Sequence, residues 1–92
     1  MQARYLVCYD IADPRRLNRA CRFMKERGLH LQLSVFLCSL SWPELSELKL
    51  SLRQLIDEAE DDVRIYPLPG AGPIVALGLG DRVGEGIAVH LS

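Results

Sequence analysis

The spacing of apolar residues changes repeatedly between residues 4 and 68, and this succession restricts the chain to few folds. The run from Arg4 to Ile11 is rich in aromatic and β-branched residues and too short for a typical helix, so it predicts a buried first strand. Beyond it, segments with apolar residues at every second position alternate with segments spaced by three and four. Such a chain is expected to form strands and helices in turn, packed in layers around one core.

The first helical segment has a clear start signal. Asp13 is a typical N-cap residue, and Pro14 has a backbone φ angle already near the helical value. The apolar residues that follow form one stripe, consisting of Leu17, Ala20, Cys21 and Met24. We expect this helix to run to about Arg27, with Gly28 in the left-handed conformation that often ends a helix.

The segment LHLQLSVFLCSL, from Leu29 to Leu40, alternates between two sides and predicts strand structure. It contains none of the Gly, Pro, Asn or Asp residues that are typical of tight hairpin turns. One long bent strand is therefore favoured. Two short strands that meet at a bulge near Ser34 are the alternative.

A second helix and a further strand complete the pattern. Ser41 and Glu44 have the spacing of a capping box, and a leucine-rich stripe then predicts a helix to about Ala59. Strand-like alternation returns from Asp62 to Leu68. This order is that of an α+β, ferredoxin-like βαβαβ sandwich, in which two helices lie on one face of an antiparallel sheet.

A chain of 92 residues has room for one domain with one hydrophobic core. We expect a single ferredoxin-like domain over residues 1–92, with its core at 4–68 and a C-terminal segment at 69–92. Within that segment, Ile74 to Leu79 and Ile87 to Leu91 predict short strands. These extra strands either extend an edge of the sheet or are exchanged in a dimer.

Charge is unevenly distributed, although the formal net charge is only −1. Residues 1–30 carry seven basic and three acidic side chains, whereas residues 41–62 carry two basic and seven acidic ones. This pattern predicts one basic and one acidic helix, and it argues against a uniformly basic nucleic-acid-binding protein.

The cysteines and the termini bear on the compartment. Cys8, Cys21 and Cys38 lack the CxxC spacing of metal or redox sites, which favours buried free thiols in a reducing environment. The N-terminal run is too short and polar for a signal peptide, and no segment is apolar enough to span a membrane. We therefore expect a cytoplasmic protein.

Several segments together resemble a known family. They are the run Tyr5-Leu-Val-Cys-Tyr-Asp10-Ile, the basic helix that starts at Pro14, and Gln32-Leu-Ser34-Val-Phe36 after Gly28. In this order and at this spacing they are similar to the CRISPR-associated protein two family, the small CRISPR-associated endoribonucleases of spacer acquisition. The resemblance covers residues 4–68 well and the tail loosely. Leu37 stands where many members carry an acid directly after the phenylalanine.

The resemblance implies a ferredoxin-like fold and a two-fold symmetric homodimer that holds Mg²⁺ between two copies of Asp10. The implied function is a magnesium-dependent endonuclease that hydrolyses phosphodiester bonds of single-stranded RNA or double-stranded DNA in spacer acquisition and antiviral defence. Some relatives serve instead as a non-catalytic dimeric scaffold that binds duplex DNA and bridges integrase subunits, and this is the alternative function. Both hypotheses make nucleic acid and the CRISPR-associated integrase subunit the expected partners.

The residues themselves support two candidate sites. Asp10 ends the first strand, and its carboxylate is free for chemistry because Asp13 already serves as the helix cap. With the resemblance, Asp10 becomes the predicted catalytic and metal-binding residue, and a solvated acid at a strand end is the alternative. Arg15, Arg16 and Arg19 are predicted to bind nucleic-acid phosphates. A solvated helix face is the alternative for these arginines.

Overall fold

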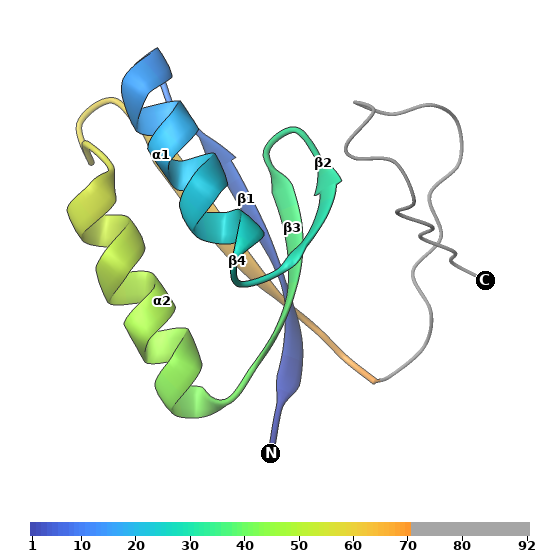
Figure 1. Cartoon of the computed structure of the whole chain (residues 1–92). Coiled ribbons are helices and arrows are strands. Elements are labelled where there is room, and N and C mark those ends of the chain that lie inside the picture. Colours follow the sequence, from blue (N-terminus) through green and yellow to red (C-terminus); the bar gives the residue numbers. More distant parts are fainter. Residues whose placement is uncertain (71–92) are drawn as a thin grey trace.

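The computed structural model describes residues 1–70 of the chain. The strands are β1 (Ala3–Asp10), β2 (Leu29–Gln32), β3 (Val35–Leu40) and β4 (Asp62–Leu68), and the helices are α1 (Pro14–Lys25) and α2 (Trp42–Leu55). The strands form one sheet in the order β2-β3-β1-β4, and all neighbouring strands are antiparallel. Both helices cover the same face of this sheet (Figure 1). The predicted α+β, ferredoxin-like class is confirmed.

The segment from 29 to 40 differs from the favoured prediction of one long bent strand, which was wrong. β2 and β3 form an antiparallel hairpin, and Leu33 and Ser34 are the two residues between them. A register shift between His30 and Gln32 marks a bulge within this hairpin. Alternation could not reveal the turn, because neither Leu33 nor Ser34 is a strong turn former.

Tertiary contacts hold this hairpin closed. The ring of His30 stacks on that of Phe36, with 4.2 Å between the ring centroids. The carbonyl of Ser34 accepts a hydrogen bond from the backbone N–H of Tyr9 at 3.1 Å. The turn is thus tied to β1 as well as to its own strands.

Both helices start where predicted, and both end earlier. The Asp13 side chain accepts from the backbone N–H of Arg16 at 3.0 Å, and Ser41 and Glu44 form the expected reciprocal capping box. α1 ends at Lys25 and α2 at Leu55. The chain after α2 turns instead around Asp57, whose carbonyl and carboxylate accept three backbone N–H groups, those of Ala59, Glu60 and Asp61.

Gly28 is required for a reason other than the predicted one. Among the described residues, the glycine with a positive φ is Gly70, at 75°. A Cβ atom on Gly28 would lie 2.6 Å from Sγ of Cys38 and 2.8 Å from the carbonyl oxygen of Leu37. The chain leaving α1 therefore passes so close to β3 that only glycine fits.

The hydrophobic core lies between the helices and the sheet. Val7, Phe36, Cys38, Ala20 and Met24 are completely buried there. The buried residues of α2 are Leu45, Leu48 and Leu52. The thiols of Cys8 and Cys21 are only half-buried, so the prediction of buried free thiols holds fully for Cys38 alone.

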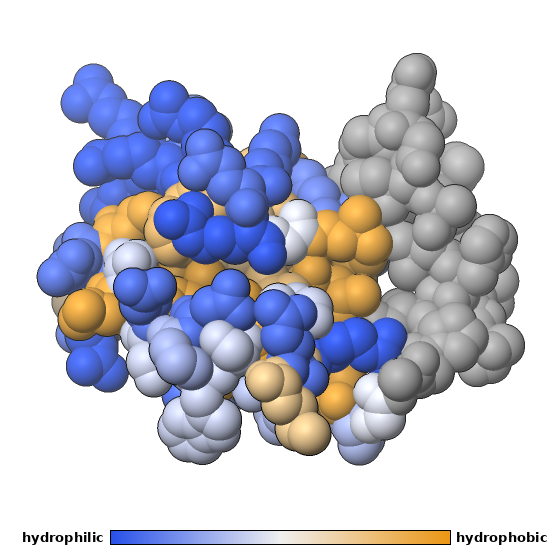
Figure 2. Space-filling model, turned by 60° about the horizontal axis from the view of Figure 1, so that its bottom comes forward, coloured by the Kyte–Doolittle hydropathy of each residue, from blue (hydrophilic) through white to orange (hydrophobic). Residues whose placement is uncertain are grey.

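The face of the sheet opposite the helices, here called the open face, carries an apolar row of its own. Leu29, Leu37, Leu6 and Tyr66 are neighbours across β2, β3, β1 and β4. The exposed fraction is 41% for Leu29 and 47% for Tyr66. Figure 2 shows a different side, the lower end of the molecule in Figure 1, where apolar side chains form a band between hydrophilic ones.

The C-terminal predictions fall outside the described residues. They are the strands Ile74 to Leu79 and Ile87 to Leu91 and their exchange in a dimer. Neither described helix is long and apolar enough to cross a membrane.

Candidate metal and nucleic-acid site

Asp10 is the last residue of β1 and is exposed. Its neighbour Tyr9 is buried against the helices, so alternation along the strand puts Asp10 on the open face. Within residues 1–70, no hydrogen bond or ion pair involves the Asp10 carboxylate. This carboxylate therefore has no structural role that the described part of the chain reveals.

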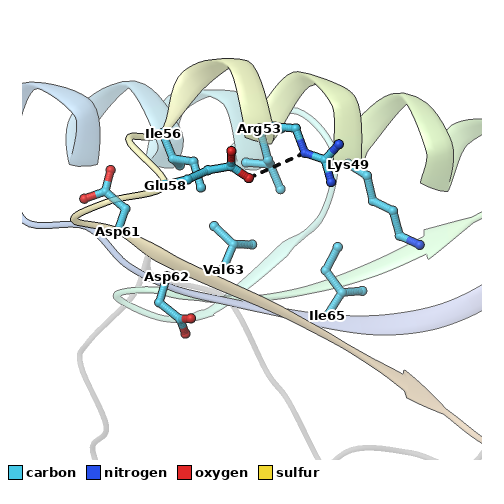
Figure 3. A pocket seen from close by; sticks show the side chains of 9 residues that line it. Lys49, Arg53, Ile56, Glu58, Asp61, Asp62, Val63 and Ile65 are labelled. Atoms are coloured by element: carbon cyan, nitrogen blue, oxygen red, sulfur yellow. Dashed lines mark ion pairs between the residues drawn. The ribbon is translucent and has the colours of Figure 1, made fainter.

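A second carboxylate stands beside Asp10. Asp62, the first residue of β4, is its cross-strand partner in the sheet register. Figure 3 shows the Asp62 side chain on the side of β4 that faces away from α2. Nε of Arg64 donates to Oδ2 of Asp62 at 2.9 Å, which partly offsets the repulsion between the two acids.

The donor set at this strand end fits Mg²⁺ only in part. Within residues 1–70 there is no group of three or more His, Cys, Asp or Glu side chains placed to hold a metal ion. Asp10 and Asp62 offer carboxylate oxygens alone, and Mg²⁺ is often held through one or two carboxylates while keeping several waters. Residues 1–70 of one chain thus offer a sparse, oxygen-only site that a second copy of Asp10 would strengthen.

The basic residues of α1 separate into two groups. Arg15 and Arg19 are exposed along one face of the helix, and Arg22 continues that face one turn later. In the described part of the chain, these three guanidinium groups have no acidic partner. They present a row of free positive charge to solvent.

Arg16, which the sequence groups with Arg15 and Arg19, is engaged elsewhere. Its Nε lies 2.9 Å from Oδ2 of Asp61, and its Nη2 lies 3.2 Å from Oδ1 of Asp61 and 3.0 Å from Oε1 of Glu60. The side chain of Arg16 is only 20% exposed and that of Asp61 is completely buried. Among the three predicted arginines, Arg15 and Arg19 are therefore the ones free to bind phosphates.

Asp61 is the residue that sequence reasoning missed. Its four hydrogen bonds include the two from Arg16, which contribute most to lowering its pKa to about 2. The separation of basic and acidic segments was a signal that charges would pair across the fold. It could not identify the pair, because only tertiary packing brings residue 61 next to residue 16.

Two of the thiols and one tyrosine hydroxyl are poor nucleophiles at neutral pH because burial raises their pKa values. Burial raises the pKa of Cys38 to about 11 and also raises the pKa of Cys8. The hydroxyl of Tyr9 is buried, and its pKa is likewise raised by burial. Chemistry through these groups is therefore disfavoured.

A hollow of about 300 Å³ lies between α2 and the edge strand β4 (Figure 3). Its apolar lining comes from Leu52, Ile56, Val63 and Ile65. Arg53 and Glu58 form an exposed ion pair at its rim, with 3.6 Å between Nε and Oε1. Asp61 and Asp62 also line the hollow, whereas Asp10 does not, so the hollow adjoins the predicted site without including Asp10.

Comparison with known families identifies the chain. The family model described as CRISPR associated protein Cas2 matches residues 1–71. The chain belongs to the Cas2 family. A relative from Thermodesulfovibrio yellowstonii, named CRISPR-associated endoribonuclease Cas2 2, is 53% identical over 97% of this chain and 98% of its own length.

Solved structures agree with the Cas2 assignment. Streptococcus pyogenes Cas2, crystallised at pH 6.5, is 36% identical with a TM-score of 0.67, over 71% of this chain and 84% of that one. A chain of a partial Cas6-RT-Cas1–Cas2 complex is 27% identical with a TM-score of 0.66, over 76% of each chain.

Proposed function

We propose that this Cas2 family member is a magnesium-dependent endonuclease that hydrolyses phosphodiester bonds of single-stranded RNA or double-stranded DNA in CRISPR spacer acquisition and antiviral defence. The observation that carries the proposal is the exposed Asp10 carboxylate, which lacks a partner within residues 1–70 and stands beside Asp62. The name of the Thermodesulfovibrio relative, an endoribonuclease, supports the reaction class.

In the proposed site, carboxylates bind the cation and arginines bind the phosphates of the substrate. Asp10 would hold Mg²⁺, with Asp62 beside it, and Arg15 and Arg19 would bind phosphates along α1. When bound, the ion would polarise a phosphoryl oxygen and lower the pKa of a bound water. Because Asp10 and these arginines lie on exposed surface rather than in a pocket, they suit a long polymer better than a small substrate.

The active form in this proposal is a homodimer. The open face presents an apolar row across all four strands, and a second copy packed on it would remove that row from water. A two-fold axis near the end of β1 would also bring a second Asp10 to the first, which doubles the carboxylate set. The sparse donor set within residues 1–70 is the reason that the proposal includes this second copy.

The test is cleavage of end-labelled single-stranded RNA and double-stranded DNA over a range of Mg²⁺ concentrations. We expect wild-type cleavage to be abolished by EDTA and reduced about 100-fold or more in Asp10→Asn, because the ligand for the cation is lost. Glu47→Gln, which removes an exposed acid from α2, should cleave as wild type does. Cleavage by Asp10→Asn at the wild-type rate would contradict the proposed catalytic role.

A second candidate function is a non-catalytic dimeric scaffold that binds duplex DNA and bridges integrase subunits. It is favoured by the row of free arginines on α1 and by the likeness to a chain of a complex that contains both Cas1 and Cas2. In this case Asp10→Asn should retain full binding to duplex DNA and to the Cas1 integrase.

Arginine variants test the phosphate contacts of either function. Each of Arg15→Ala and Arg19→Ala should weaken duplex binding and lower the slope of log affinity against log salt by about 1. Arg53→Ala on α2, where the arginine is paired with Glu58, is the matched control and should leave the slope unchanged. Unchanged slopes in all three variants would remove α1 from the binding surface.

A further inference from the structure

The carboxylate of Asp61 joins three separate pieces of chain. Its Oδ1 accepts from the backbone N–H of Ala12 at 3.0 Å and from Arg16 Nη2, and its Oδ2 accepts from Arg16 Nε and from the backbone N–H of Asp57 at 2.8 Å. Each oxygen thus accepts two hydrogen bonds, which uses the acceptor capacity of a carboxylate fully. The side chain is completely buried, so water does not compete for these bonds.

The position of this cluster gives it more than a local role. Ala12 is two residues beyond Asp10, and Asp61 immediately precedes Asp62, the cross-strand partner of Asp10. Arg16 lies in the first turn of α1, directly after the short connection from β1. The cluster therefore links the chain that leaves Asp10 to the chain that enters Asp62.

We propose that Asp61, acting through Arg16 and Ala12, is a positioning residue that holds the Asp10 and Asp62 carboxylates in register for a divalent cation. This inference rests on the proposed metal site at Asp10. Strand pairing alone leaves the last residues of β1 and the first of β4 free to fray, because a terminal ladder position has neighbours on one side only. The bidentate contact between Arg16 and Asp61 removes that freedom just beyond both strand ends.

The Glu60 contact has a lesser part in this arrangement. Glu60 meets Arg16 through one oxygen at 3.0 Å, and its side chain is 59% exposed. An exposed ion pair of this kind contributes little to stability. The buried bidentate contact with Asp61, in contrast, fixes both the distance and the orientation of the Arg16 guanidinium. Positioning is therefore assigned to Asp61 rather than to the acidic turn in general.

The experiment measures Mn²⁺ affinity of the full-length protein by calorimetry, for wild type, Asp10→Asn, Asp61→Asn and Arg16→Lys. Arg16→Lys keeps the positive charge but cannot form the bidentate contact with both Asp61 oxygens. This variant supplies the test if Asp61→Asn fails to fold. We expect Asp61→Asn and Arg16→Lys each to bind Mn²⁺ about 10-fold more weakly than wild type, as is typical when the support of a metal ligand is removed. Glu58→Gln, in the same turn but outside the cluster, should bind as wild type does.

A variant with a destabilising change elsewhere in the fold shows whether lower stability alone weakens Mn²⁺ binding. Leu45→Val removes packing near the opposite end of α2 and should lower the melting temperature without changing Mn²⁺ affinity. If Asp10→Asn weakens Mn²⁺ binding but folded Asp61→Asn and Arg16→Lys do not, the inference is overturned while the proposed site stands. If Asp10→Asn binds as tightly as wild type, the proposed site is wrong and the inference falls with it.

Discussion

At the scale of single residues, the same charge type takes opposite roles depending on what it contacts. Asp10 and Asp61 are both aspartates near the same end of the sheet, yet one is exposed and unpaired within residues 1–70 and the other is buried under four hydrogen bonds. Arg15 and Arg16 are adjacent in sequence, but only Arg16 is turned towards an acid. Function is proposed for the free member of each pair and positioning for the bound one.

The bound pair predicts a specific pH dependence. The pKa of Asp61 is lowered from its ordinary value of 3.8 to about 2, chiefly by the hydrogen bond from Arg16. A carboxyl group with a lowered folded-state pKa stabilises the fold above its unfolded-state pKa and loses this contribution as pH falls towards the folded-state value.

We therefore expect wild type to exceed Asp61→Asn in urea midpoint by a constant amount above about pH 5. The difference should shrink as pH falls from about 4 to about 2. Urea unfolding followed by circular dichroism at several pH values measures it, and Glu58→Gln provides the exposed control. A difference that stays constant down to pH 2 would show that Asp61 is not stabilised as an anion.

At the scale of elements, the sequence predicted the first residues of the helices more accurately than their last residues. Asp13 and Ser41 are caps whose side chains bond to backbone N–H groups a few residues away, and such local chemistry is readable from sequence. The ends of α1 and α2 depend on where the chain must turn to meet the sheet. The hairpin between β2 and β3 likewise depends on pairing with β1 rather than on turn residues.

The cap of α2 allows a matched test with two serines of one helix. Ser41→Ala removes the oxygen that accepts from the backbone N–H of Glu44 at 3.3 Å, and it should cost about 1 kcal/mol in the free energy of unfolding. Ser46→Ala, at an exposed position inside the helix, should change it by less than about 0.5 kcal/mol. Chemical denaturation measures both values, and equal losses would contradict the capping role.

At the scale of the whole molecule, the described helices cover one apolar face of the sheet, and the opposite face carries a single apolar row across its strands. The covered face forms the core around Phe36 and Met24. The open face, with Leu37 and Leu6 on its two inner strands and Tyr66 on the edge strand β4, is the surface that we propose for homodimer formation. The two carboxylates at the end of this face would then lie beside the dimer interface.

The proposed interface predicts a change of mass. Tyr66→Glu places a charge in the apolar row of the open face, and it should convert the homodimer to a single chain in light scattering after size exclusion. Leu50→Glu is the control, because Leu50 is 57% exposed on α2, away from that face. Loss of the dimer in Leu50→Glu alone would place the interface on the helices instead.

Alternation and caps in the sequence were enough to place both helices, the first and last described strands, and Asp10 at a strand end, and to indicate the ferredoxin-like class. These features are local, since each depends on residues within a few positions of one another. Tertiary structure decided the hairpin at Leu33 and Ser34, the close approach that requires Gly28, and the pairing of Arg16 with Asp61. Each of these depends on contacts between different segments, such as Ser34 with Tyr9, Gly28 with Cys38 and Arg16 with Asp61, and such contacts exist only once the sheet and helices have packed.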